Sequence, residues 1–353
     1  MMQQQVIQAA LNAWRRGEPG ALGTIVAVEG SAYQREGASV FVNLDGSVQG
    51  LISGGCLESE VAGEAQSLRA ATPRVLRYDT SDESIFGYGM GCPGIVDVLL
   101  EKLPPGESPL QSFLARIVDG MPAARGVRLD SASSGVLQDI VYIPGRGVVG
   151  SLGAEELDAQ FLTFAQRRVE EARAPEGRHL DGLPGTAEVF AWIVPAEAEC
   201  VIFGATDDAR PLAQMAREIG LKVRLVDPRR HLATEERFPG ADVHCVALQD
   251  YQSVVELDSH SYVVVMGHQV ESDLAALSLA LQTGVPYIGL LSSQGRRDSM
   301  LAHLRADGLV AEAEPPALRS PAGLWIGART PEEIALSIVA EICSVRRQAA
   351  TCM

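Results

Sequence analysis

The spacing of hydrophobic and polar positions changes along this chain of 353 residues. Near the N-terminus, β-branched and apolar residues form short runs, and Asp45-Gly46 between two of them is a hairpin turn signal. These runs predict strands at 21–28, 39–43 and 48–52. Apolar residues then recur at helical spacing, at Leu57, Val61, Ala65 and Leu68. Acidic residues in the first turn of this segment predict that the helix begins near Cys56.

The middle of the chain has a less regular pattern. Its apolar runs predict strands at 126–129, 135–143, 147–152 and 187–194, and helices at 110–117 and 155–173. The segment 175–184 is rich in glycine and charge, so we predict a loop there.

From Glu199 onward, short apolar strands alternate with amphipathic helices. The strands are predicted at 200–203, 222–226, 243–248, 262–266 and 287–291, and the helices at 209–219 and 274–282. Such alternation is typical of a parallel sheet with helices on both faces. We therefore predict an α/β protein. A mixed α+β N-terminal domain at 1–196, with its core at 20–103, is followed by a Rossmann-like parallel-sheet C-terminal domain at 197–353.

The segment Ser53-Gly54-Gly55-Cys56 places a cysteine between a predicted strand and a predicted helix. The free backbone N–H groups and the dipole of a helix start favour anions, and they lower the pKa of a thiol. This segment therefore predicts a reactive thiolate or a bound anion. The alternative is a small cysteine that is buried beside a tight turn.

A second cysteine stands in a run of glycines that includes Gly89, Gly91 and Cys92. Glycine accepts a positive φ and leaves its N–H group uncovered, which suits backbone that approaches a flat or phosphorylated ligand. An ordinary loop between two strands is the alternative for this run. Of the remaining cysteines, Cys200 and Cys245 fall in predicted strands and are expected in the core.

The first strand of the C-terminal domain leads into Gly204, and an acidic residue, Asp227, ends the second strand. This placement matches the dinucleotide-binding fingerprint, which asks for G-x-G-x-x-G/A and an acid about 20 residues further on. Thr206 stands where the second glycine should let backbone meet a pyrophosphate, and Asp207-Asp208 add negative charge there. NAD or NADP is therefore not expected. A pterin, another small ligand or no ligand at all remain open for this site.

Two more polar residues follow predicted strands of the same sheet, His268 and Ser292. Ligands of open α/β sheets bind beyond the carboxyl ends of the strands, so both residues are candidate contacts. His268 could serve as a general acid or base or as a metal ligand, or it could simply end the strand ahead of the next helix.

Composition narrows the cellular context. A hydrophobic content of 46% suffices for real cores, and no apolar run approaches the length of a membrane span. The six cysteines form no C-x-x-C pair, which favours reduced thiols and a cytoplasmic protein. A formal net charge of −16 disfavours nucleic acid and anionic membrane as partners.

Two blocks of sequence together resemble the XdhC/CoxI family. The first contains Gly30-Ser31-Ala32, Ser53-Gly54-Gly55-Cys56, Tyr78-Asp79-Thr80-Ser81-Asp82, Gly91-Cys92 and Asp97-Val98-Leu99-Leu100. The second contains Tyr287-Ile288-Gly289-Leu290-Leu291-Ser292-Ser293, Gly323-Leu324 and the run from Ile326 to Ala335. The chain departs from the family at Thr206, where a glycine is usual, and at Gly267, where a threonine commonly precedes the histidine.

The resemblance implies an accessory factor for xanthine dehydrogenase and related molybdenum hydroxylases. Such a protein binds molybdenum cofactor (molybdopterin) transiently, supports its sulfuration through a cysteine desulfurase, and passes it to the apoenzyme. The cofactor would be held by Ser53, Gly54, Gly55, Cys56, Gly89, Gly91 and Cys92, with Gly204, Asp227, His268 and Ser292 as contacts in the second domain. Cys56, with Cys92 as a second candidate, would ligate molybdenum or carry sulfur.

This interpretation makes the protein a maturation chaperone more than a catalyst. It also allows a homodimer. Two alternatives remain open, an oxidoreductase that uses NAD(P) and a non-catalytic scaffold between desulfurase and apoenzyme.

In the last helix, Thr330 and Glu333 have the spacing of a capping box, for which we expect a structural role.

Overall fold

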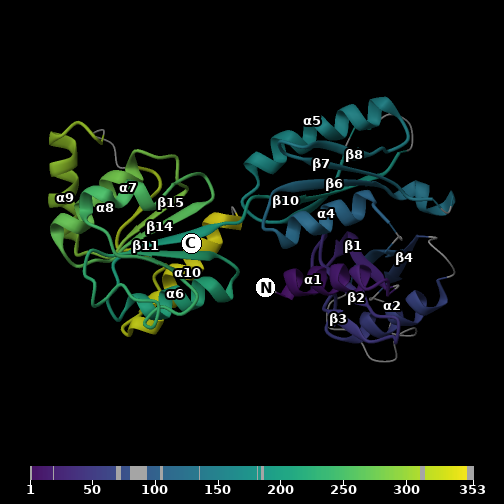
Figure 1. The fold of residues 1–353 in the computed structure, drawn as a ribbon, viewed down its shortest axis with the longest axis horizontal. Coiled ribbons are helices and arrows are strands. Elements are labelled where there is room, and N and C mark those ends of the chain that lie inside the picture. Colours follow the sequence, from purple (N-terminus) through teal and green to yellow (C-terminus); the bar gives the residue numbers. More distant parts are fainter. Residues whose placement is uncertain are drawn as a thin grey trace. The chain divides into compact units, whose positions relative to one another are not determined.

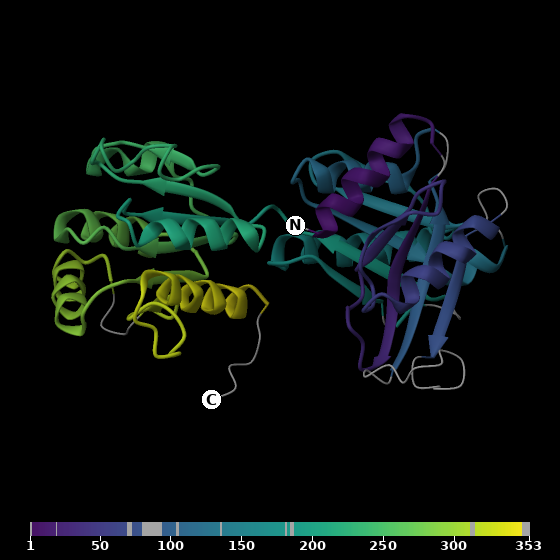
Figure 2. The same ribbon diagram turned by 90° about the horizontal axis from the view of Figure 1, so that it is seen from below.

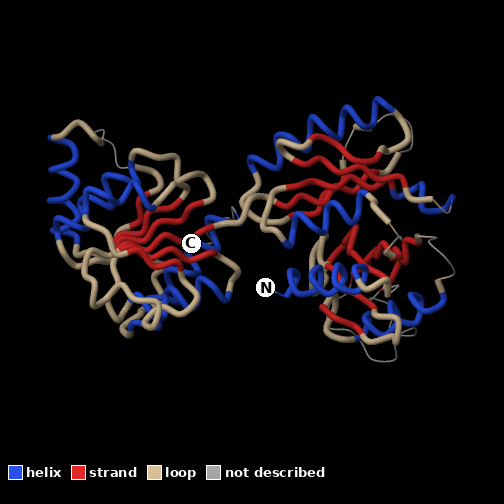
Figure 3. Tube along the Cα trace, viewed as in Figure 1, coloured by secondary structure: helices blue, strands red, loops and turns tan. Residues whose placement is uncertain are grey.

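A computed structural model describes residues 2–18, 20–68, 73–79, 94–103, 106–134, 136–180, 182–183, 187–310 and 315–347. The chain separates into two compact units, Met1–Ala196 and Glu197–Met353. Each unit has its own sheets (Figure 3). Each unit also has its own hydrophobic cores. In the described part of the chain, no helix is both long and apolar enough to cross a bilayer.

The first unit begins with a five-stranded antiparallel sheet, here called sheet A, in the order β3-β2-β1-β5-β4. Its elements are α1 (Met2–Arg15), β1 (Ala21–Gly30), β2 (Ser39–Val42), β3 (Val48–Gly50), α2 (Cys56–Ser67), β4 (Arg74–Asp79) and β5 (Gly94–Lys102). The three strands and the helix predicted for this region are confirmed. The register of β1 on β5 shifts between Ile25 and Ala27, which marks a β-bulge.

A second antiparallel sheet, sheet B, follows in the order β8-β7-β6-β10-β9. Its elements are α4 (Pro109–Val118), β6 (Ala123–Arg128), the 3₁₀ helix η1 (Leu129–Ser134), β7 (Gln138–Ile143), β8 (Gly147–Gly150), α5 (Glu155–Glu171), β9 (Glu176–His179) and β10 (Val189–Val194). The loop predicted for 175–184 is wrong, because β9 lies within it. This strand has no apolar alternation; it forms because β10 offers it backbone partners and Arg168 binds Glu176 at 2.6 Å.

The two sheets of the first unit pack through one shared core. Helix α2 covers one face of sheet A, where Val61 lies against Ile25 and Val98. The other face of sheet A meets α1, α4 and sheet B, and this core includes Val26 and Trp192. Figure 1 shows α5 on the outer face of sheet B.

One ion pair crosses this core. Arg125 on β6 is 2% exposed and donates to both carboxylate oxygens of Glu101 on β5, at 2.7 and 2.8 Å. Its Nε also donates to Asp139 on β7 at 2.9 Å. A buried charge is stable only when it is paired and hydrogen-bonded, so these three side chains depend on one another.

The second unit is a six-stranded parallel sheet in the order β13-β12-β11-β14-β15-β16. Its strands are β11 (Glu199–Phe203), β12 (Lys222–Val226), β13 (Asp242–His244), β14 (Ser261–Val265), β15 (Tyr287–Leu290) and β16 (Leu318–Arg319). Its helices are α6 (Ala209–Glu218), the 3₁₀ helix η2 (Leu248–Asp250), α7 (Tyr251–Val254), α8 (Val270–Leu281), α9 (Gln294–Ala306) and α10 (Pro331–Arg347).

Helices cover both faces of this sheet. Helices α6 and α10 pack on one face, and α7, α8 and α9 pack on the other (Figure 2). The predicted α/β fold, with a Rossmann-like second domain, is confirmed. The capping box predicted for the last helix is also present: Thr330 accepts from Glu333 N at 3.3 Å, and Glu333 accepts from Thr330 N at 3.1 Å.

Candidate functional site

The first candidate site is the turn from Ile52 to Cys56 that leads into α2. Cys56 is the first residue of this helix, which confirms its predicted place at a helix start. Gly55 precedes it with a φ of 115°, a conformation that favours glycine. The backbone of the turn is therefore shaped by a glycine immediately before the cysteine.

The hydroxyl of Ser53 is fully used within this turn. It accepts from Gly55 N at 3.2 Å and from Leu57 N at 3.0 Å, and it donates to Glu58 at 2.5 Å. Ser53 is 5% exposed. The hydroxyl of Ser53 therefore holds the turn. Because Gly55 N and Leu57 N already donate to it, these two N–H groups are not free to bind an anion.

Glu58 is the residue of this turn whose role the sequence analysis missed. Its Oε1 accepts from Ile52 N and Ser53 N, both at 2.8 Å. Burial raises the pKa of Glu58, but the hydrogen bonds from Ser53 and Ile52 outweigh burial and hold that pKa below its usual value. A glutamate at the third position of a helix is a known capping signal, but that signal predicts a bond from the N-cap residue, here Gly55, and not from Ile52 and Ser53.

Gly54 and Gly55 are exposed and stand in open space. Among the described residues, no atom lies within 4 Å of the position that a Cβ atom would take at either glycine. Packing therefore gives no reason for a glycine at position 54. The remaining members of the predicted N-terminal site, Gly89, Gly91 and Cys92, lie outside the described residues.

The second candidate site is the carboxyl edge of the parallel sheet. Gly204, directly after β11, has a φ of 122°, and a Cβ atom there would lie 2.7 Å from the Cα of Gly267. Gly204 is thus required by the close approach of the segments that follow β11 and β14.

Asp227, directly after β12, is 1% exposed, and both of its oxygens are occupied. Oδ2 accepts from Ala205 N at 2.8 Å and from Arg229 Nη2 at 2.6 Å. Oδ1 accepts from Arg229 N at 2.8 Å and from Arg229 Nε at 2.9 Å. Burial raises the pKa of Asp227, but these hydrogen bonds outweigh it and the pKa is lowered.

His268 lies at the same edge with a φ of 61°, which is rare for a residue other than glycine. Its Nε2 lies 2.9 Å from Asp208 Oδ2, and its carbonyl oxygen accepts from Arg296 at 3.2 Å. Arg229 reaches the carbonyl of the neighbouring Gly267 at 3.3 Å. The structure therefore brings Gly204, Asp227 and His268 together.

Ser292 follows the next strand, β15, and its hydroxyl donates to the carbonyl of Ser293 at 3.1 Å. Arg296, one turn into α9, donates to Asp273 at 2.5 Å as well as to His268. Arg296 therefore links the start of α9, which follows β15, to His268 and Asp273.

The two cysteines expected in the core of the second unit have different environments. Cys200 is completely buried, and burial raises the pKa of its thiol to about 12. Cys245 lies just beyond β13 and is exposed, so the prediction of a core position for it is wrong. The strand ends at His244, and its last residues are only partly covered. In the described residues, no three or more His, Cys, Asp or Glu side chains form a group that could hold a metal ion.

Family models and a relative match this chain over most of its length. Family models described as "XdhC and CoxI family" and "XdhC Rossmann domain" match residues 13–79 and 200–342. A protein of Bacillus subtilis (strain 168) that is named as a probable xanthine dehydrogenase subunit is 30% identical over 341 residues, covering 94% of this chain and 95% of that protein. The chain belongs to the XdhC and CoxI family.

Two further proteins align with this chain along most of their length. The molybdenum cofactor insertion chaperone PaoD of Escherichia coli (strain K12) is 25% identical over 342 residues, covering 97% of this chain and 88% of that protein. A crystal structure named as a xanthine dehydrogenase from Bacillus halodurans superimposes with a TM-score of 0.79 at 28% identity. It covers 99% of this chain and 97% of that one. The family resemblance noted in the sequence is thus confirmed.

Proposed function

We propose that this XdhC/CoxI family member is a maturation factor for molybdenum cofactor. It binds the cofactor transiently, supports its sulfuration and inserts it into a xanthine dehydrogenase-type molybdenum hydroxylase. The names of two relatives support this, since one is a molybdenum cofactor insertion chaperone and the other a probable xanthine dehydrogenase subunit. The single structural observation that carries the proposal is the exposed Gly54-Gly55 turn at the start of α2.

The shape and chemistry of this turn fit a bulky anionic cargo. Glycines without neighbouring side chains allow a ligand to approach the backbone closely. Ser53 and Glu58 hold the turn with hydrogen bonds of 2.5 to 3.2 Å, so the turn is formed before the cargo arrives.

The thiol of Cys56 is proposed to ligate the molybdenum of the cargo or to carry sulfur to it. A helix start lowers the pKa of a cysteine, and a thiolate is the form that ligates soft metals and attacks sulfur. We place Gly89, Gly91 and Cys92 in the same site on the basis of their sequence. The Gly204, Asp227, His268 and Ser292 edge of the second unit is proposed as a further contact for the cargo.

The test compares two thiols. Cys56→Ser is expected to weaken cofactor binding about tenfold or more, because it removes a charged ligand. Cys343→Ser is the matched control, since Cys343 is a partly buried thiol on α10, and none of the proposed contacts lies on that helix. Binding is measured by titration with cofactor that is released from a molybdenum enzyme. Equal affinities of wild type, Cys56→Ser and Cys343→Ser would remove Cys56 from the site.

The partners follow from the same proposal. We expect binding to a cysteine desulfurase, to an apo-hydroxylase and to a second copy of this chain, in the reduced environment of the cytoplasm. Pull-down with each purified partner and mass measurement of the free protein test these contacts. If both enzymes bind but no pterin can be extracted from the loaded protein, the interaction-scaffold alternative is favoured instead.

NAD and NADP are not proposed as ligands. In dinucleotide sites the acid at the end of the second strand accepts a hydrogen bond from a ribose hydroxyl. Here the corresponding Asp227 is occupied by Ala205 and Arg229. Calorimetric titration with both dinucleotides tests this, alongside Thr206→Gly with Asp207 and Asp208 neutralised. Micromolar binding by the unmodified chain, with hydride transfer, would favour the oxidoreductase alternative.

A further inference from the structure

The loop between β16 and α10 carries the most exposed large apolar side chain in the part of the chain that the structure describes. Trp325 is 92% exposed, its neighbour Ile326 is 52% exposed, and Leu336 on α10 is 53% exposed. Leu324 N donates to the carbonyl of Ser337 at 3.1 Å, so the loop lies beside the turn of α10 that contains Leu336. The side chains of Trp325, Ile326 and Leu336 are here called the apolar patch.

The loop that carries Trp325 is held by hydrogen bonds on both sides of the tryptophan. Before it, Gly323 N donates to Glu341 at 2.8 Å. After it, Arg329 N donates to Glu333 at 2.7 Å. Gly323 also has a φ of 97°, a conformation that favours glycine. A side chain that is held in place before its partner arrives loses little entropy on binding.

The chain contains three tryptophans, and the other two pack in the first unit. Trp192 is 3% exposed and belongs to the core between sheet A and sheet B, and Trp14 packs against the same core. Trp325 has no comparable packing, so it contributes little to the stability of the folded chain. Tryptophan buries a large apolar area on contact and is enriched at the centres of protein interfaces. The apolar patch is therefore best explained as an interface.

Two exposed residues of opposite charge flank the patch, Arg329 and Glu332. Arg329 follows Ile326 by three positions, and Glu332 lies one turn before Leu336 on α10, on the same face of that helix. Neither side chain forms an ion pair with another side chain that the structure describes. The patch thus has an apolar centre and a rim with one positive and one negative charge, as interfaces commonly have.

We propose that a second copy of this chain docks on the apolar patch across a two-fold axis. A two-fold interface uses the same surface of both copies, so that surface must be complementary to itself. Arg329 of each copy then lies opposite Glu332 of the other, and the two Trp325 side chains pack near the axis. A partner surface of one charge sign would be repelled by either Arg329 or Glu332. An anionic lipid surface is disfavoured by the net charge of −16.

This dimer rests on the second copy that the proposed function expects, but its formation requires no cofactor. Its test is therefore the oligomeric state of the free protein. The cofactor titration with Cys56→Ser is a separate measurement, so the dimer surface and the cofactor site can fail independently.

The experiment measures the mass of the full chain over a dilution series, by light scattering or sedimentation. Trp325→Ala should raise the dissociation constant of the dimer about tenfold or more, because a central tryptophan is a typical hot spot. Val270→Ala is the matched control. Val270 is 55% exposed and lies on α8, which packs on the opposite face of the sheet from α10. Both substitutions are at exposed positions, so both variants should fold.

Charge reversal tests the two-fold arrangement. Arg329→Glu and Glu332→Arg should each raise the dissociation constant about tenfold, because like charges then face each other. A chain that carries both reversals should dimerise like wild type, since each charge again meets its opposite. For the same reason, a mixture of the two single variants should form a mixed dimer more tightly than either variant dimerises alone.

Three results would overturn the proposal. The first is a monomer at every concentration. The second is a dimer in which Trp325→Ala and Val270→Ala dissociate alike. The third is a double reversal of Arg329 and Glu332 that dimerises as weakly as the single variants.

Discussion

The turn before α2 and the turn before α6 are built from similar parts. Each contains a glycine with a positive φ, Gly55 at 115° and Gly204 at 122°. Each directs backbone N–H groups to an acid of low exposure, Glu58 in the first unit and Asp227 in the second. In both cases hydrogen bonds outweigh burial and lower the pKa of the acid.

The two turns differ in what surrounds their glycines. A side chain at Gly204 would meet the backbone of Gly267 at 2.7 Å, whereas Gly54 and Gly55 have no described atom within 4 Å of a Cβ position. The first glycine is explained by packing and the second pair is not. A glycine-rich turn therefore indicates a ligand site only after packing has been excluded as the reason for its glycines.

The largest effect is expected for Gly204→Ala. The added methyl group meets backbone that cannot rotate away, and alanine is strained at a φ of 122°. We expect the free energy of unfolding of the second unit to fall by about 3 kcal/mol or more. Urea unfolding followed by circular dichroism measures this. Gly284→Ala is the control, and a Gly204→Ala protein as stable as that control would contradict the packing explanation.

A smaller effect is expected for the two acids. Asp227→Asn and Glu58→Gln should each lower the free energy of unfolding of their own unit by about 1–3 kcal/mol at pH 7. The folded pKa of each acid lies below its unfolded value, so this contribution is complete above the unfolded pKa. It is lost as the pH falls through the folded pKa.

The measurement is unfolding at neutral pH and again at a series of acidic pH values that extends below the folded pKa of each acid. The gap between wild type and each variant should close on acidification. Glu60→Gln, an exposed position on α2, should show no gap at any of these pH values. If the difference in free energy of unfolding between wild type and variant is unchanged in acid, the negative charge of these acids is not the source of their stabilising effect.

The smallest effect on stability is expected for Gly54→Ala. Because the position stands in open space and Gly54 does not have a positive φ, the free energy of unfolding should change by less than about 1 kcal/mol. Cofactor binding should nevertheless weaken, because the methyl group occupies the approach to the backbone. Gly63→Ala within α2 serves as the control for binding. If Gly54→Ala and Gly63→Ala both bind the cofactor like wild type, close approach of a ligand does not explain the glycine at position 54.

The sequence predicted the fold better than the sites. Alternating apolar strands and amphipathic helices are enough to define a parallel sheet, because each element carries its own periodicity. Strand β9 was missed since its partners on β10 lie more than ten residues away, and Glu176 to His179 has no local strand pattern. Pairing between distant segments decides such cases.

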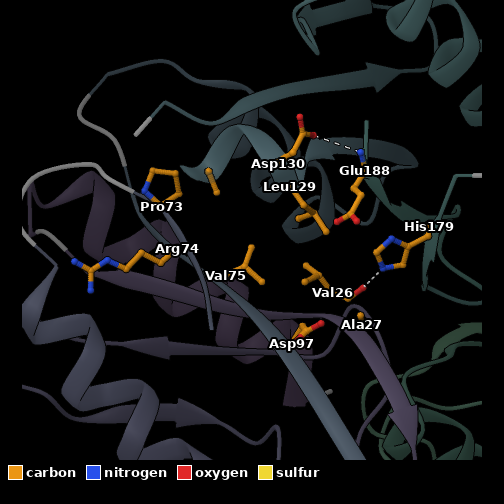
Figure 4. Close-up of a pocket in the computed structure, with 11 residues that line it drawn as sticks. Val26, Ala27, Pro73, Arg74, Val75, Asp97, Leu129, Asp130, His179 and Glu188 are labelled. Atoms are coloured by element: carbon orange, nitrogen blue, oxygen red, sulfur yellow. Dashed lines mark hydrogen bonds between the residues drawn. The ribbon is translucent and has the colours of Figure 1, made fainter. Parts of the chain in front are cut away.

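Site chemistry was harder to predict for a related reason. Asp227 stands at the right spacing for a ribose contact, but its capture by Arg229 depends on side-chain geometry that spacing does not contain. A cavity between the two sheets of the first unit is lined by residues as far apart in the chain as Val26 and Glu188 (Figure 4). No local motif connects them, so only the folded arrangement of both sheets reveals the cavity.

The buried arginine between the sheets has a consequence for how this protein can be divided. Arg125 belongs to sheet B, and its bidentate partner Glu101 belongs to sheet A. A fragment that ended after β5 would leave Glu101 without its counter-charge, a loss of about 3–5 kcal/mol. The family match at residues 13–79 ends before both partners of this ion pair. We expect related chains to contain both sheets. We also expect them to keep Arg125, Glu101 and Asp139 together or to replace all three.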